Sequence, residues 1–153
     1  MLTESKRLNI AIILFVIINI YGLFWGSLYA ILGTLMPYHE TAIGATSSEV
    51  RDYNPRLMLL IGFIIRMEGV AQICICITNL FILNYSFRNK EKWSWIVFLI
   101  TGLIFDVSML IALYIVLGPL TMQFWYYCLI TSLFIIAIGI SYKEFFPKSK
   151  TAI

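Results

Sequence analysis

Three ionisable residues lie deep inside otherwise apolar stretches of this chain. Arg66 and Glu68 fall near the middle of an apolar run over residues 57–84, and Asp106 lies at the centre of another over residues 93–117. A charge at the centre of a membrane helix costs about 2.5 to 3.5 kcal/mol on insertion scales. These three groups therefore need partners inside a helix bundle, and they are the first candidates for a functional site.

Helical geometry and depth predict how the three charges pair. At about 100° per residue, Arg66 and Glu68 point in opposite directions, so they cannot meet the same partner. Arg66 and Asp106 reach similar depths, and an opposite-charge pair offsets part of the desolvation cost of both groups. Glu68 beside Asp106 would instead force one carboxyl to keep its proton. We therefore expect an Arg66–Asp106 pair, which either only joins two helices or also contacts a ligand or a proton.

Cysteine and histidine residues follow no pattern typical of a redox or metal centre. Cys74 and Cys76 are two positions apart on one predicted helix and point away from each other. The single histidine, His39, lies in a predicted loop, which excludes a bis-histidine haem. The acidic residues around it lack the spacing of zinc or calcium loops. We therefore predict no metal and no cofactor, and we identify no catalytic set of nucleophile, base and orienting group.

The composition indicates an integral membrane protein. Of 153 residues, 61% are hydrophobic and 12% are charged, against about a quarter charged in soluble domains. Four apolar stretches are each long enough to cross a bilayer. They cover approximately residues 8–36, 57–84, 93–117 and 120–142. We predict a single all-α domain over residues 1–153, an antiparallel bundle of four transmembrane helices with an exterior loop at residues 37–56.

The distribution of basic residues predicts the orientation of this bundle. The side that holds both termini has eight: Lys6, Arg7, Arg88, Lys90, Lys92, Lys143, Lys148 and Lys150. The opposite side has only Arg51 and Arg56. Because cytoplasmic loops carry an excess of Lys and Arg, both termini are expected to be cytoplasmic. The net charge of +3 follows from this topology, and no basic patch is dense enough to suggest nucleic acid as a partner.

Small and polar residues predict how the first two spans pack. Gly22, Gly26, Ala30 and Gly33 lie close to one face of the first span, and such spacing lets a neighbouring backbone approach closely. We interpret this face as a packing surface rather than a ligand groove. In the second span, polar and small residues follow two opposite stripes. We therefore expect this helix to lie inside the bundle, with little of its circumference facing lipid.

Local signals mark several helix ends. Thr46 and Glu49 match a capping box in the loop, and Asn54 followed by a proline is typical of a helix start. The pattern Leu-Tyr-x-x-Leu-Gly-x-Leu occurs at residues 28–35 and again at 113–120, at the outer ends of the first and third spans. Two explanations stay open: a duplicated two-helix hairpin, or a chance match within a shared membrane composition.

Aromatic residues gather in the outer halves of the spans. Trp25, Tyr29, Tyr114 and Trp125 belong to this set. If they point inward, they form a chamber above Arg66 that suits a flat or elongated apolar molecule with an anionic or polar head. The alternative is an aromatic belt at the membrane interface together with ordinary packing.

These observations favour a non-enzymatic multi-pass membrane protein that binds an apolar or lipid-like small molecule, with Arg66 as the anchor of the head. The predicted ligand-binding residues are Arg66, Glu68, Asp106, Trp25, Tyr29, Tyr114 and Trp125. A first alternative is a structural or accessory subunit, as a homo-oligomer or in a larger membrane complex. A second alternative is an enzyme on a lipidic substrate, with Glu68 or Asp106 as acid or base. Membrane lipid is the expected surrounding partner in each case.

Overall fold

The computed structural model describes residues 5–147, and every regular element in that range is a helix. The long helices are α1 (Lys6–Leu32), α4 (Pro55–Ile82), α5 (Lys92–Leu117) and α6 (Met122–Phe145). Two short helices, α2 (Pro37–Ile43) and α3 (Ser47–Tyr53), lie between α1 and α4, and a π-helical turn, η1 (Leu83–Phe87), continues α4. All four long helices are long and apolar enough to cross a membrane. The prediction of an all-helical chain with four such helices is therefore confirmed.

Side-chain caps begin α3 and α4 where the sequence predicts them. The hydroxyl of Thr46 accepts a hydrogen bond from the backbone N–H of Glu49 at 3.3 Å, and the Glu49 carboxylate accepts from the N–H of Thr46 at 2.7 Å. The Asn54 side-chain oxygen accepts from the N–H groups of Arg56 and Leu57 at 3.1 and 3.2 Å. Both predicted caps are confirmed, because each depends only on residues that are neighbours in the chain.

The first helix ends at Leu32, earlier than the sequence boundary at residue 36. Gly33 has a left-handed φ of 54°, and its N–H donates to the carbonyl of Tyr29 at 3.1 Å, which closes the helix. Gly118 closes α5 in a related way, with a φ of 78° and an N–H bond to the Tyr114 carbonyl at 3.1 Å. Both glycines belong to the repeated octapeptide, so the two copies share a role as helix stops.

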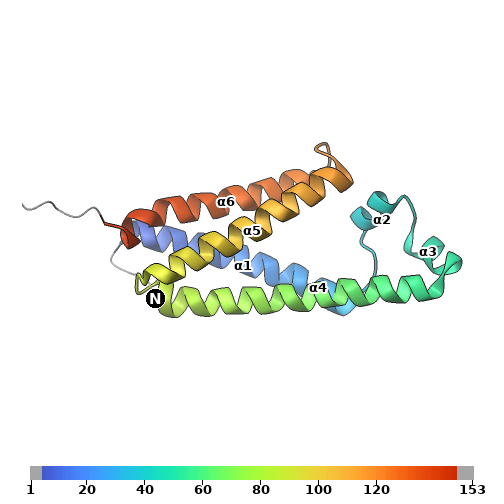
Figure 1. Ribbon diagram of the computed structural model, residues 1–153, viewed down its shortest axis with the longest axis horizontal. Coiled ribbons are helices and arrows are strands. Elements are labelled where there is room, and N and C mark those ends of the chain that lie inside the picture. The colour runs from blue at the N-terminus through green and yellow to red at the C-terminus, as the bar shows by residue number, and fades with distance from the viewer. Residues whose placement is uncertain (1–4, 148–153) are drawn as a thin grey trace, which may run out of the picture.

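The long helices pack in the order α4, α1, α6, α5. Figure 1 shows that α1 starts beside α6 and crosses obliquely to end beside α4. α5 packs against α6. We call the end where Ser5, η1 and α6's last turn meet the inner end, and the end that carries α2 and α3 the outer end. Toward the outer end, α4 and the α5–α6 pair diverge (Figure 1).

The prediction that the second span lies inside the bundle is wrong. α4 packs chiefly on α1, and large apolar side chains on its other faces, such as Leu59 and Phe63, are exposed. The physical reason is that only the glycine side of α4 permits close approach. A Cβ atom at Gly69 would lie 2.4 Å from the Ala30 nitrogen, and one at Gly62 would lie 2.6 Å from the carbonyl oxygen of α1's closing glycine. The interpretation of the small residues as a packing face is confirmed.

An aromatic core holds the inner end together. Phe15 of α1 packs against Phe87 of η1, Phe98 of α5 and Phe134 of α6, with ring centroids 4.7 to 5.7 Å apart. These rings are buried and belong to a cluster whose buried members come from α1, η1, α5 and α6, with Ile82 at the end of α4 packed against it. A separate, smaller cluster at the outer end joins α3 to α4. Dense packing is therefore concentrated at the inner end, where the four helices converge.

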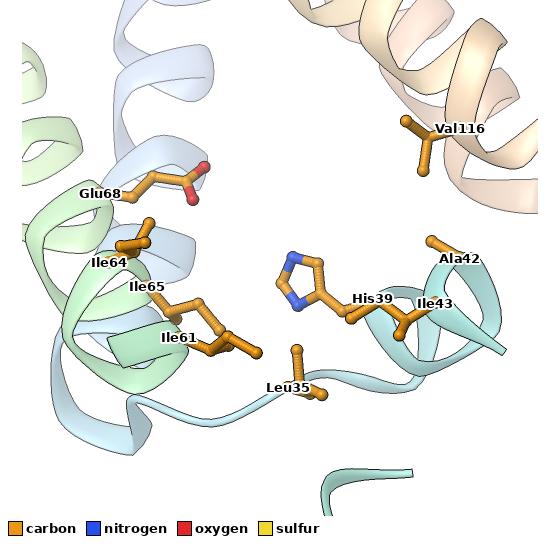
Figure 2. A pocket seen from close by; sticks show the side chains of 9 residues that line it. All are labelled: Leu35, His39, Ala42, Ile43, Ile61, Ile64, Ile65, Glu68 and Val116. Carbon is orange, nitrogen blue, oxygen red and sulfur yellow. The ribbon is translucent and has the colours of Figure 1, made fainter. Parts of the chain in front are cut away.

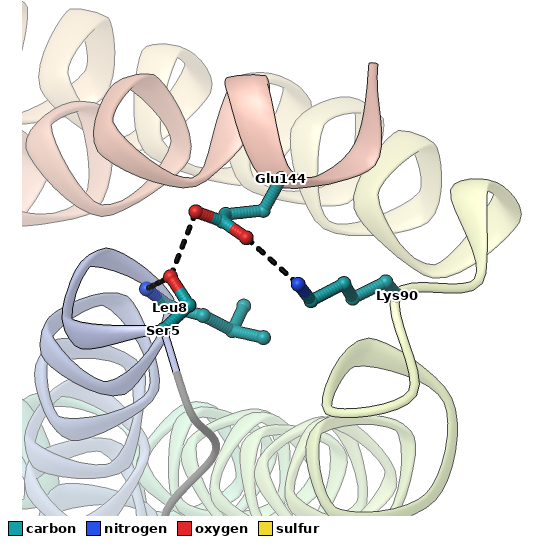
Figure 3. A network of polar contacts seen from close by, with 4 residues as sticks. All are labelled: Ser5, Leu8, Lys90 and Glu144. Carbon is teal, nitrogen blue, oxygen red and sulfur yellow. Dashed lines mark hydrogen bonds and ion pairs between the residues drawn. The ribbon is translucent and has the colours of Figure 1, made fainter. Parts of the chain in front are cut away.

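A polar cluster around Glu144 connects three segments at the same end. One carboxylate oxygen of Glu144 accepts from the hydroxyl of Ser5 at 2.7 Å, and the other pairs with the ammonium of Lys90 at 2.8 Å (Figure 3). The same Ser5 hydroxyl accepts from the N–H of Leu8 and so caps α1. A partly exposed ion pair contributes about 0 to 1 kcal/mol, so the cluster matters chiefly for geometry.

Candidate functional site in the outer half

A cleft of about 310 Å³ opens between α4 and α5 at the outer end. Two polar side chains extend into it from different walls, Glu68 from α4 and His39 from α2 (Figure 2). The rest of the lining is apolar and consists of Leu35, Ala42, Ile43, Ile61, Ile64, Ile65 and Val116. This volume lies at the lower end of the range for small-molecule pockets, about 300 to 1,000 Å³.

The oblique course of α1 creates this cleft. α1 leaves α6 on its way to α4, so the outer half of the α5–α6 pair has no long helix beside it on that side (Figure 1). The short helix α2 partly fills the space and packs against α5. Its neighbour α3 packs on α4, and Val50 of α3 joins Met58 and Ile65 of α4 in the outer cluster. The two short helices thus link the diverging halves.

Hydrogen bonds fix α2 and α3 to each other. The Glu40 carboxylate accepts from the backbone N–H of Ser47 at 2.7 Å and from the Ser47 hydroxyl at 2.8 Å. These bonds stabilise the charged form and lower the pKa of Glu40. The segment that carries His39 is therefore held in place by the start of the next helix.

His39 presents a hydrogen-bond donor to the cleft. Its Nδ1 atom accepts from the backbone N–H of Met36 at 3.1 Å, which assigns the proton of the neutral ring to Nε2. Burial lowers the pKa of His39, so the neutral ring predominates at pH 7. With the Glu68 carboxylate as an acceptor on α4, the cleft combines one donor and one acceptor in an apolar lining (Figure 2).

An aromatic row on α1 leads from this cleft toward α6. Tyr21, Trp25 and Tyr29 are four positions apart, and successive ring centroids lie 6.2 and 6.1 Å apart. Tyr29 is 6.2 Å from the ring of His39, and Tyr21 is 5.5 Å from the ring of Tyr126 on α6. α1 therefore has two distinct faces: its glycines pack against α4, and its aromatic rings point toward the space beside α6.

Tyr38 connects the short helix α2 to the aromatic row on α1. Its hydroxyl is hydrogen-bonded to the hydroxyl of Tyr29. Burial raises the pKa of Tyr38, and the bond to Tyr29 and the nearby charge of Glu68 act in the same direction. Tyr38 therefore stays protonated, and its hydroxyl is held by Tyr29 beside the site.

Arg66 and Asp106 do not pair, so the sequence prediction is wrong on this point. The Arg66 guanidinium donates to the carbonyls of Ala30 and Leu32 at 3.5 and 3.4 Å, while Asp106 accepts from the Tyr127 hydroxyl at 3.3 Å. Within residues 5–147 the single ion pair is the one at the inner end. Arg66 lies beside the C-terminus of α1, where orphan carbonyls and the negative end of the helix dipole attract a cation. Asp106 is on α5, which packs on α6 instead.

The other predicted site residues divide between the interior and the surface. Glu68 lines the cleft, and Trp25 and Tyr29 belong to the aromatic row beside it. Tyr114 and Trp125 are 57% and 64% exposed, and each packs against Phe124 instead of facing the cleft. Asp106 is only 8% exposed but is absent from the cleft lining. The structure therefore brings together only part of the predicted chamber.

Sequence reasoning missed His39, Tyr21 and Tyr38 as components of this site. The spacing of four between Tyr21 and the two aromatic residues that follow it was a usable signal, because such residues share a helical face. His39 was considered only as a metal ligand in a solvated loop. No comparable signal existed for Tyr38, since its position depends on α2 folding back toward α5.

Separate contacts of Arg66 and Asp106 predict independent effects on stability. Arg66→Met should lower the free energy of unfolding by about 0.5 to 1 kcal/mol, because it removes the cation at the end of α1. Combining it with Asp106→Asn should give the sum of the two single effects, since residues without a shared partner are usually additive. Unfolding of detergent-solubilised wild type, both single variants and the double variant measures this. A coupling energy above about 1 kcal/mol would indicate a direct pair.

The polar groups of the cleft have no metal-binding arrangement. Within the described part of the chain, no three His, Cys, Asp or Glu side chains converge in a way that could hold a metal ion. The cleft therefore offers a ligand hydrogen bonding and apolar contact.

No protein-family model, no curated protein and no solved structure matches this chain.

Proposed function

We propose that this chain is a multi-pass membrane protein that binds a small apolar molecule with a hydroxyl or amine head in the cleft between α4 and α5. The observation that supports it is an apolar lining of seven side chains around two polar ones, Glu68 and His39 (Figure 2). Pockets that bind small molecules typically combine an apolar lining with a few convergent polar groups.

The polar pair selects the chemistry of the head. A hydroxyl group can donate to the Glu68 carboxylate and accept from the Nε2–H of His39, and an amine can pair with Glu68 as a cation. Arg66 does not line the cleft, and its guanidinium is directed at the end of α1. An anionic head would face a carboxylate without a compensating cation. We therefore replace the anionic or polar head that Arg66 was expected to anchor with a head that donates a hydrogen bond to Glu68.

The proposal includes an antiparallel bundle with both termini in the cytoplasm. The excess of basic residues at the inner end supports this orientation. The contacts of Glu144 with Ser5 and Lys90 support the antiparallel arrangement, because they join the start of α1, the α4–α5 connection and the end of α6 at one end of the bundle. Duplication of a helical hairpin stays a prediction, supported only by the two octapeptides that end α1 and α5.

Variants that change the cleft test the binding proposal. Ile64→Phe should narrow the cleft without disturbing the core, because Ile64 lines it and is 54% exposed. Glu68→Gln should remove the charged acceptor and lower affinity for an amine by about 10- to 100-fold, as expected for a hydrogen bond to a charged group. The measurement is the small-molecule content of identically purified proteins by native mass spectrometry, followed by titration with a long-chain alcohol and a long-chain amine.

Ile77→Phe is the matched control, since Ile77 is on the same helix, is 45% exposed and does not line the cleft. It should bind like the wild type. Equal binding by wild type, Ile64→Phe and Glu68→Gln would contradict the proposal. A wild-type protein that carries no small molecule and binds neither probe, but retains a protein partner, would favour the accessory-subunit alternative.

A further inference from the structure

A second cleft, also of about 310 Å³, lies at the inner end, far from Glu68 and His39. It is lined by Arg7 from the first turn of α1 and by Gly139, Ile140 and Lys143 from α6. The site therefore combines two cations from neighbouring helices with a small apolar surface. Nothing in the outer cleft depends on these residues.

Both cations of the inner cleft are available to a ligand. The side chains of Arg7 and Lys143 are exposed, and neither forms a hydrogen bond or ion pair with another described residue. The nearest acidic neighbour in sequence, Glu144, already holds Ser5 and Lys90 with its two oxygens (Figure 3). Arg7 also interacts electrostatically with the Glu144 carboxylate, but neither cation of the cleft forms a direct ion pair with a described residue.

The apolar part of the cleft is a notch at Gly139. A Cβ atom placed on Gly139 would meet no atom within 4 Å, so the surface is open there. Gly139 is four positions before Lys143 and thus lies on the same face of α6, about 6 Å further into the span. A molecule with a charged group at the cations has room for an apolar chain in this notch.

We propose that this cleft binds an anionic phospholipid, with its phosphate between Arg7 and Lys143 and the start of an acyl chain in the Gly139 notch. Charge complementarity supports this choice, because two cations that form no ion pair with a described residue attract an anionic head group, and basic pockets between membrane helices bind such heads. The apolar notch next to the cations favours a lipid over free phosphate. The proposal is independent of the ligand in the outer cleft.

The test compares binding of dioleoylphosphatidylglycerol and dioleoylphosphatidylcholine to delipidated full-length protein, titrated in detergent and followed by native mass spectrometry. The wild type should prefer phosphatidylglycerol. At about fivefold per cation, the double variant Arg7→Gln/Lys143→Gln should lower its affinity roughly 25-fold. The matched control Arg51→Gln/Arg56→Gln removes two cations at the outer end and should leave the affinity unchanged. Equal losses in both double variants would overturn the proposal.

Gly139→Leu separates a lipid site from simple charge attraction. It fills the notch but keeps both cations, and the open space around Gly139 means that the fold should tolerate it. We expect phosphatidylglycerol binding to fall at least fivefold, while the thermal midpoint stays that of the wild type. Unchanged binding by this variant would overturn the acyl-chain contact. Competition by millimolar inorganic phosphate as strong as that by phosphatidylglycerol would assign the cations to free phosphate instead and would also overturn the proposal.

Discussion

Replacing Gly69 by alanine is expected to disrupt the contact between α1 and α4. The added Cβ atom would lie 2.4 Å from the backbone nitrogen of Ala30 and 2.5 Å from the backbone oxygen of Gly26. Because both atoms belong to the backbone, a side-chain rotation cannot relieve the overlap and the helices must separate. Overpacking typically costs about 1 to 3 kcal/mol, and we expect a loss at or above the upper end of that range. Thermal unfolding of the detergent-solubilised protein measures it.

Gly139→Ala is the matched control for this prediction. Its added Cβ atom would meet nothing within 4 Å, and alanine is favoured over glycine inside a helix by about 1 kcal/mol. The control should therefore leave the stability unchanged or raise it slightly, whereas Gly69→Ala lowers it despite the same gain in helix propensity. A Gly69→Ala protein as stable as the control would mean that α1 and α4 do not approach so closely.

The second large effect is expected at Gly102, where α5 meets α6. A Cβ atom there would lie 1.9 Å from the ring of Phe134, which is buried in the inner aromatic core against Phe15. The ring must move out of its place, so Gly102→Ala should destabilise the protein by about 3 kcal/mol, between the costs of overpacking and of losing a buried phenylalanine. The measurement is the same unfolding assay.

A double variant distinguishes this mechanism from a general weakening of α5. Phe134→Leu removes the ring atoms that the new methyl group would meet, so Gly102→Ala should cost far less in the Phe134→Leu background. We expect a coupling energy of at least about 1 kcal/mol in the double-mutant cycle. If the two losses simply add, the ring of Phe134 does not lie over Gly102.

The parts of the fold that were predictable from the sequence are those set by short-range signals. The number of long helices follows from apolar length, and the caps at Thr46 and Asn54 follow from hydrogen bonds between near neighbours in the chain. The glycine face of α1 was also readable, since its spacing matches the helical period. None of these signals requires knowledge of which helices are neighbours.

The prediction of an Arg66–Asp106 pair was wrong because a similar depth in the membrane does not show which helices pack against each other. Both residues could be placed at a similar level along their helices, but α4 packs on α1 and α5 packs on α6. Arg66 therefore finds carbonyl oxygens on α1 within reach. The same limitation explains why Tyr114 and Trp125 do not face the cleft. Their position in the outer half was predictable, but the direction of their side chains depends on how α5 and α6 meet.

Within the candidate site, the sequence identified Glu68 but not its opposing group. An acidic residue inside an apolar run is conspicuous, whereas His39 lies in a segment expected to be solvated. The proline that opens α2 and Gly44 that ends it, with a φ of 72°, are recognisable helix signals. What they do not reveal is the tertiary contact that brings α2 against α5 and turns His39 toward α4.

The divergence of α4 and α5 also determines whether a ligand would enter the outer cleft from the bilayer or from water. Ile64 and Val116 line it from two different helices and are 54% and 57% exposed, so in the proposed membrane orientation the opening would face sideways, toward acyl chains instead of water. An occupant then arrives after dissolving in the bilayer, and each methylene adds about 0.8 kcal/mol to that partitioning. The bilayer acts as a reservoir that concentrates the occupant by orders of magnitude. Occupancy should thus follow the mole fraction in lipid, and even a shallow cleft can fill at trace aqueous concentrations.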